Sequence, residues 1–128
     1  MTTKSELYGG DVAPSEESLF GFVEHGFLKD PNSLAVVSRS QKGDHLAEIV
    51  HASTGSQPKR VHDPCLRWTY AEFFSVTVNL ATAFTVQNLN ADSITVTFIP
   101  NSVEWLLLFS ASVVAKTGMA YLLSLIHI

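Results

Sequence analysis

The chain has 128 residues, which is the length of one domain and too short for a complete two-domain enzyme. Hydrophobic residues make up 46% of it and charged residues only 16%, a composition that argues against a disordered chain. Its net charge of −4 argues against nucleic acid as a partner, and its one cysteine, Cys65, excludes an internal disulfide.

The N-terminal part of the chain predicts a flexible lead-in followed by a helix. Residues 1–14 include two glycines and a proline, which are typical of an irregular stretch. Ser15 precedes two glutamates and suits a helix cap, and apolar residues at helical spacing then continue to a predicted helix end at Gly26. A turn at residues 30–32 and a short strand at residues 34–38 are expected next.

A long polar segment follows at residues 39–64. Glycines and prolines interrupt it, so it is interpreted as a loop insertion with a short strand at residues 49–51. Residues 66–68 predict the return strand of a β-hairpin with residues 34–38.

The clearest element begins at Thr69. Thr69 and Glu72 have the spacing of a capping box, and apolar side chains then recur with helical period to about Gln87. A turn is expected at residues 88–92. The alternating β-branched residues at 94–99 predict a strand, which Pro100 ends.

A second helix is predicted over residues 102–117. Asn101 and Glu104 repeat the capping pattern, and Gly118 suits the position after the last turn. A strand at residues 119–122 completes the order strand, helix, strand. This order predicts a βαβ unit of parallel strands and an α/β fold.

The second half of the chain is nearly uncharged. From Trp68 to Ile128 the charged residues are Glu72, Asp92, Glu104 and Lys116. Such a sequence must bury most of its surface, either in a larger protein or in a membrane. A single-span membrane helix near residues 102–122 is one alternative, but Lys116 and the capped start favour a buried helix of a globular protein, so a membrane is not expected as a partner.

The last six residues are interpreted as an adaptor-derived tail. Residues 123–128 read Leu-Ser-Leu-Ile-His-Ile, which is one translation of a common transposase-derived sequencing adaptor. Such a scar is excluded from fold reasoning. The remaining native part would then be residues 15–122 with their lead-in.

Ordinary structural or surface roles explain the candidate chemical motifs of this sequence. A metal site is not expected, because the spacing of the candidate ligands matches no known zinc pattern and they lie in the irregular segment: His45, His51, His62 and Cys65. The segment Ser53-Thr-Gly-Ser56 with Lys59 and Arg60 lacks the spacing of a phosphate loop. Glu72 and Glu104 are explained by capping, so no catalytic, cofactor-binding or metal-binding residue is assigned.

Three segments together resemble the beginning of an AMP-forming acyl-CoA synthetase, of the adenylate-forming ligase superfamily. Residues 30–37 (Asp-Pro-Asn-Ser-Leu-Ala-Val-Val) resemble the segment after that family's first helix, and residues 66–72 (Leu-Arg-Trp-Thr-Tyr-Ala-Glu) resemble its Leu-Thr-Tyr-Ala-Glu helix start. Residues 94–105 (Ile-Thr-Val-Thr-Phe-Ile-Pro-Asn-Ser-Val-Glu-Trp), continued by residues 114–121, resemble its strand, turn and Lys-Ala-Gly-Ala-x-Tyr end.

Two positions depart from the family pattern, and two other features indicate a subgroup of the family. Asn90-Ala-Asp92 stands where the family usually has Pro-Gly-Asp, and Thr117 stands in place of alanine. The insertion at residues 39–64 and the Trp68 variant most resemble fungal members.

The resemblance implies an incomplete N-terminal part of the ligase large domain. Members of the family use Mg·ATP to convert a carboxylic acid to an acyl-adenylate and then transfer the acyl group to coenzyme A or a carrier thiol. ATP, Mg²⁺ and coenzyme A are thus implied for a full-length parent, with the remainder of that parent as the partner of this chain. The phosphate loop, the acid pocket and the catalytic lysine lie later in the family's sequence, so this chain is expected to be inactive and to bind none of these cofactors.

The expected location is intracellular, cytoplasmic or peroxisomal, since the first eight residues lack the pattern of a secretory signal. The alternative to a ligase fragment is a small non-catalytic α/β protein whose apolar helix binds a partner.

Overall fold

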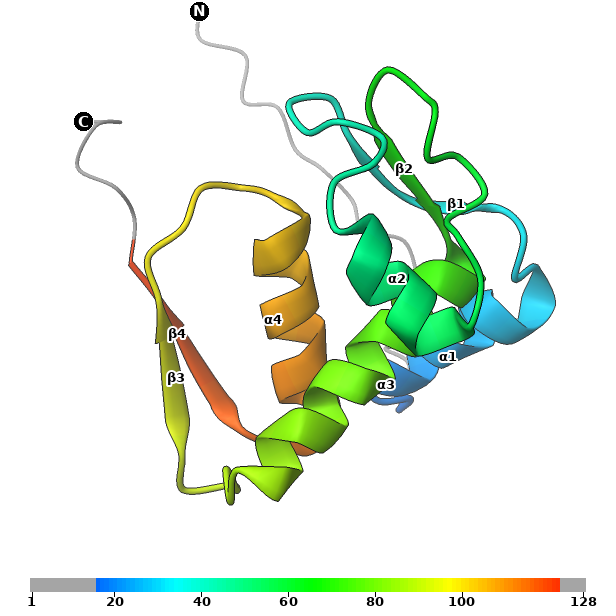
Figure 1. The fold of residues 1–128 in the computed structure, drawn as a ribbon. Helices are drawn as coiled ribbons and strands as arrows, with labels where there is room; N and C mark the ends of the chain where they lie inside the picture. Colours follow the sequence, from blue (N-terminus) through cyan, green and yellow to red (C-terminus); the bar gives the residue numbers. More distant parts are fainter. Residues whose placement is uncertain (1–15, 123–128) are drawn as a thin grey trace, which may run out of the picture.

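A computed structural model describes residues 16–122 and contains four helices and four strands within that range (Figure 1). The predicted lead-in at residues 1–14 and the predicted adaptor-derived tail at residues 123–128 lie outside the described residues. The elements in chain order are α1 (Leu19–Lys29), β1 (Leu34–Ser38), α2 (Ala47–Thr54), β2 (Leu66–Thr69), α3 (Tyr70–Val86), β3 (Ile94–Thr97), α4 (Val103–Ala115) and β4 (Gly118–Tyr121). The α/β class is confirmed.

Helix α1 begins and ends later than its sequence pattern predicts. Its cap is Ser18, whose Oγ accepts a hydrogen bond from the N–H of Gly21 at 3.0 Å, and Ser15 lies outside the described residues. The helix continues through Gly26 to Lys29. Gly26 instead allows α1 to approach α3 closely, because a Cβ at this position would lie only 3.2 Å from the ring of Tyr70 at the start of α3.

Strands β1 and β2 pair antiparallel, as predicted. Leu34 lies opposite Thr69 and Ser38 lies opposite Leu66, with an irregularity in the register between Leu34 and Val36. This pairing brings the β2 end, where α3 begins, next to the start of β1.

The predicted strand at residues 49–51 is wrong, because these residues form the middle of α2. A helix places Val50 in the core with no exposed surface, and Gly55 ends the helix with a positive φ of 77°. The segment at residues 39–64 is therefore a loop interrupted by a two-turn helix.

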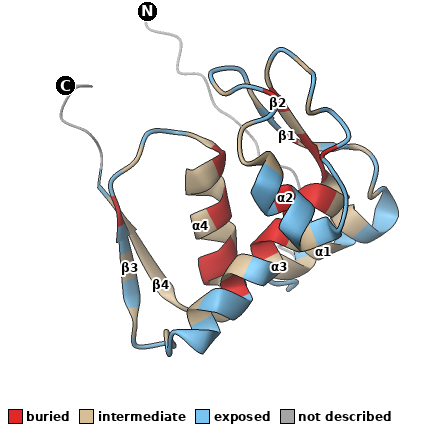
Figure 2. Cartoon of the chain, viewed as in Figure 1, coloured by how far each residue is buried: buried red, intermediate tan, exposed pale blue. Residues whose placement is uncertain are grey.

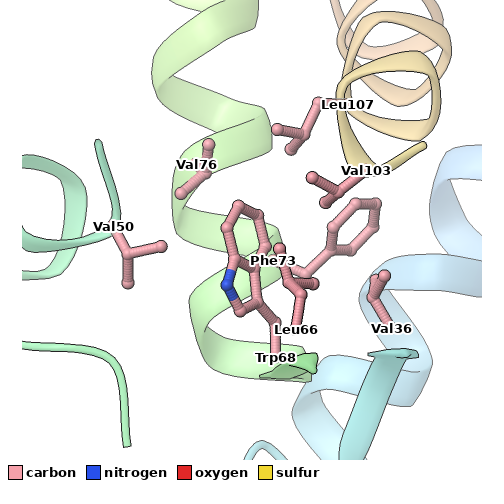
Figure 3. Packing of buried hydrophobic residues seen from close by; sticks show 8 residues of the cluster. All are labelled: Val36, Val50, Leu66, Trp68, Phe73, Val76, Val103 and Leu107. Atoms are coloured by element: carbon pink, nitrogen blue, oxygen red, sulfur yellow. The ribbon is translucent and has the colours of Figure 1, made fainter. Parts of the chain in front are cut away.

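The main hydrophobic core lies where α2, α3, α4 and the β1–β2 sheet meet. Trp68 and Leu66 on β2 are completely buried, and Phe73 and Val76 of α3 cover them from one side (Figure 3). In Figure 2 the buried residues follow the facing sides of α3 and α4. The central position of α3 explains why its capping box matters for the whole fold.

The β3–α4–β4 segment forms the predicted βαβ unit of parallel strands. Ile94 pairs with Gly118 and Thr97 pairs with Tyr121. Strand β3 stops at Thr97, two residues before the predicted end of the strand. Gly118 begins β4 and so does not act as the helix end.

Both ends of α4 differ slightly from prediction. The cap is Ser102 and not Asn101, because the Ser102 Oγ accepts a hydrogen bond from the N–H of Trp105 at 3.5 Å. The helix ends at Ala115 because Lys116 adopts a left-handed conformation with φ 56°. Among the described residues no helix has the length and hydrophobicity needed to cross a membrane.

The β3–β4 sheet has one covered face and one bare face. Tyr121 packs against Trp105 of α4, so the side chains that share its face point toward the helix. The opposite face of the sheet carries Ile94 and Val96 of β3 and Phe98, which follows β3. These side chains are strongly exposed, at 69%, 61% and 65%. These three side chains are called the outer apolar face below.

Candidate functional site

The most developed polar arrangement joins the loop after β1 to the first turn of α4. Glu104 accepts a hydrogen bond from the Gln41 Nε2 at 2.7 Å, and its other oxygen contacts the Nε2 of His45. The Gln41 Oε1 accepts from the N–H of Val103 at 3.0 Å. Gln41, His45 and Glu104 are called the Glu104 cluster.

The Glu104 carboxylate is strongly stabilised in its charged form. Burial alone would raise its pKa, but hydrogen bonds from His45, its own backbone N–H, Ser102 and Gln41 outweigh burial and lower the pKa to about 2. A carboxylate with so low a pKa is a weak base and is not protonated near neutrality. The cluster is therefore suited to holding the loop on the helix rather than to transferring protons.

Replacing Glu104 with glutamine is expected to lower the free energy of unfolding at pH 7 by about 1 kcal/mol, since the carboxylate is partly solvent-screened. The folded pKa of about 2 lies below the ordinary 4.5, so this stabilisation is present above pH 4.5 and is lost as the pH falls toward 2. Urea unfolding of both proteins between pH 7 and pH 2 checks this, with exposed Glu48→Gln as control. A constant difference across that range would contradict it.

The side chains considered for metal binding do not come together. His45 belongs to the Glu104 cluster, His51 lies in α2, and Cys65 is half-buried beside β2. Among residues 16–122 there is no group of three or more histidine, cysteine, aspartate or glutamate side chains placed to hold a metal ion.

The segment Ser53-Thr-Gly-Ser56 forms the C-terminal end of α2 and the residues that follow it. The Thr54 Oγ1 donates a hydrogen bond to the carbonyl of Val50 at 2.8 Å, and Gly55 caps the helix. A helix C-terminus presents carbonyl oxygens and a partial negative charge, which repel a phosphate. The geometry therefore gives a physical reason against phosphate binding here.

Glu72 is a structural carboxylate, and its capping role is confirmed. Its Oε2 accepts hydrogen bonds from the N–H of Thr69 at 2.7 Å and from the Thr69 hydroxyl at 2.8 Å. Its Oε1 accepts from the N–H of Lys59 at 2.7 Å, a contact that the capping pattern does not predict. One buried side chain thus caps α3 and fastens the loop that precedes β2.

The Glu104 cluster could not be found from the sequence. Gln41 and His45 lie 63 and 59 residues before Glu104, so no local spacing connects them. Comparison with protein-family models, curated proteins and solved structures finds no match. The cluster is therefore interpreted from its own contacts, as a fastening between the loop and α4.

Proposed function

We propose that this chain is the first part of the large domain of an adenylate-forming ligase. The parent activates a carboxylic acid with Mg·ATP to an acyl-adenylate and passes the acyl group to coenzyme A or a carrier thiol. Residues 16–122 serve as scaffold, and the chemistry belongs to later parts of the parent. Three features of the fold support this proposal.

The first two segments that resemble the family contact each other. The N–H of Ala71 donates to the carbonyl of Pro31 at 3.0 Å, and the N–H of Tyr70 donates to the carbonyl of Ser33 at 3.0 Å. The turn before β1 therefore holds the first turn of α3, which gives a common structural role to two segments whose contacting residues are 37 and 40 positions apart.

The two halves of the third segment also contact each other. Trp105, at the end of the Pro-Asn-Ser-Val-Glu-Trp turn, meets Tyr121 edge to face, with ring centroids 5.6 Å apart at 73°. The Tyr121 hydroxyl donates to the carbonyl of Ile99 at 3.1 Å. Trp105 in the first turn of α4 and Tyr121 at the end of β4 thus fasten the turn after β3 to β4.

The outer apolar face is the observation that carries the proposal. A parallel sheet is normally covered by helices on both faces, and here α4 covers one face while Ile94, Val96 and Phe98 lie exposed on the other. A larger α/β domain supplies such a cover. The same face also fits the alternative of a small α/β protein that binds a partner there.

Removing the outer apolar face is expected to reduce self-association of the isolated chain. Val96→Thr together with Phe98→Thr should raise several-fold the concentration at which the chain aggregates. The reason is that exposed apolar strand residues drive association between the sheets of different copies of the chain. Light scattering against concentration measures this. Val36→Thr, at a buried position, is the matched control and should increase aggregation by destabilising the core.

ATP–pyrophosphate exchange tests the activity. The purified 128-residue chain should show no exchange with any carboxylic acid, whereas the product of the complete gene should exchange in the presence of its acid. Exchange by the chain alone would overturn the scaffold role. A complete gene product inactive with a broad panel of acids would count against the ligase.

A further inference from the structure

A cavity of about 240 Å³ lies where α1, α3, α4 and β1 meet. Its lining on α4 includes Leu106, Ser110 and Val114, which follow one another at intervals of four residues and therefore share one face of the helix. Phe73 and Thr77 line it from α3 with the same spacing. The cavity is thus bounded by helix faces that converge on it.

Helix α1 leaves one side of this cavity open. It contributes Leu19, Phe20 and Val23 to the lining, yet none of its 11 residues is buried. Leu19 is 54% exposed, whereas Phe73 and Thr77 on α3 are only 5% and 3% exposed. The cavity therefore has a buried floor and a rim that a small molecule can reach from solvent.

Ring contacts hold α1 in place beside the cavity. Phe74 of α3 stacks on Phe27, with centroids 4.5 Å apart and 15° between the planes, and on Phe20, with centroids 6.0 Å apart and 23° between the planes. Phe20 and Phe74 also line the cavity. Two of its walls are therefore joined to each other, and the space between them exists before any ligand binds, as is usual for small-molecule sites.

The chemistry of the lining selects an uncharged ligand. None of the described residues that line the cavity is charged, and the polar ones are the hydroxyl-bearing Tyr70, Thr77 and Ser110. A charged group placed there would lose its water without gaining a counter-charge. An apolar molecule would instead gain close contacts with the apolar walls, which water does not provide.

We propose that this cavity binds a small uncharged molecule built on one benzene ring. Five of the described lining side chains are aromatic, and packing of a ring against other rings adds to the burial of apolar area. A cavity of about 150 Å³ already takes up benzene, and this larger cavity has room for a substituent on the ring. The proposal does not depend on the ligase origin, because neither ATP nor an acid substrate enters it.

Toluene and benzoate test the chemical class of the ligand, because they share a ring and only benzoate is charged near neutrality. Each is titrated into the dilute full chain, labelled at the valine methyl groups, and ring-current shifts are followed by NMR. Val23 on α1 and Val114 on α4 line the cavity, whereas Val50 lies in the core and outside the described lining; Val23→Ile and Val114→Ile assign the signals. Toluene should shift Val23 and Val114 saturably, with a Kd on the order of 1 mM, and leave Val50 unchanged. Benzoate should bind at least about tenfold more weakly.

Filling the cavity tests the position of the ligand. Ser110→Leu adds apolar bulk at a lining position and should weaken toluene binding about tenfold or more. Ser53→Leu is the matched control, because Ser53 lies on α2 and lines a different cavity, and it should leave toluene binding unchanged. The proposal is overturned if Val23 and Val114 do not respond, if Val50 shifts as they do, if benzoate binds as tightly as toluene, or if a folded Ser110→Leu binds toluene normally. If Ser110→Leu does not fold, the methyl shifts of the unaltered chain with the two probes decide.

Discussion

Replacing Trp68 with alanine will lower the free energy of unfolding by about 3–5 kcal/mol, the largest effect expected of any single substitution here. The indole has no exposed surface and lies at the centre of the core with Leu66 and Val50 (Figure 3). Alanine leaves a cavity that the β1–β2 sheet and α3 can close only in part. Because small domains have about 5–15 kcal/mol of stability in total, this loss is a large part of it.

Urea unfolding followed by circular dichroism measures this loss. The matched control is Val37→Ala on β1, where the side chain is 50% exposed and the expected change is within about 0.5 kcal/mol. A loss below about 1 kcal/mol for Trp68→Ala would contradict the placement of β2 at the centre of the core.

Replacing Glu72 with alanine is expected to cost about 3 kcal/mol. The substitution removes the acceptor of three hydrogen bonds, two from Thr69 and one from the N–H of Lys59, at a side chain that is only 5% exposed. Part of the cost is the lost cap of α3, which by itself is about 1 kcal/mol.

The contact with Lys59 gives this prediction a local readout. Hydrogen exchange of the Lys59 amide should accelerate in Glu72→Ala by a larger factor than global destabilisation explains, because the loop before β2 loses its attachment. Glu72→Gln retains an acceptor oxygen and should lose about half as much stability. Glu48→Ala at an exposed position is the control. Equal stability of Glu72→Ala and the unaltered chain would show that the carboxylate does not hold the loop.

Two features with clear local sequence signals are confirmed. The capping box at Thr69 and Glu72 depends on residues three positions apart, and the parallel βαβ unit depends on the order of short neighbouring elements. The caps at Ser18 and Ser102 lie three residues and one residue after the predicted ones, because other polar residues, Ser15 and Asn101, stand close by and carry the same signal.

Features set by tertiary packing could not be predicted. The β-branched pair Ile49 and Val50 favours a strand locally, and α2 forms because a helix buries Val50 while Gly55 ends it. The Glu104 cluster depends on a contact across 59 and 63 residues, which no local pattern encodes. The prediction that Glu104 pairs with an Asn101 cap is therefore wrong: Ser102 is the cap, and the Glu104 carboxylate fastens the loop that carries His45.

The most direct test of the proposed ligase origin is to read the gene beyond codon 122. If the chain is the first part of a ligase, the frame continues, with a further strand after Tyr121 and then a loop rich in serine, threonine and glycine that binds the phosphates of ATP. Residues 123–128 should be replaced in the genomic sequence by native ones. A stop codon shortly after Tyr121, or a long frame without such a loop, would contradict the account and favour a small α/β protein that binds a partner through its outer apolar face.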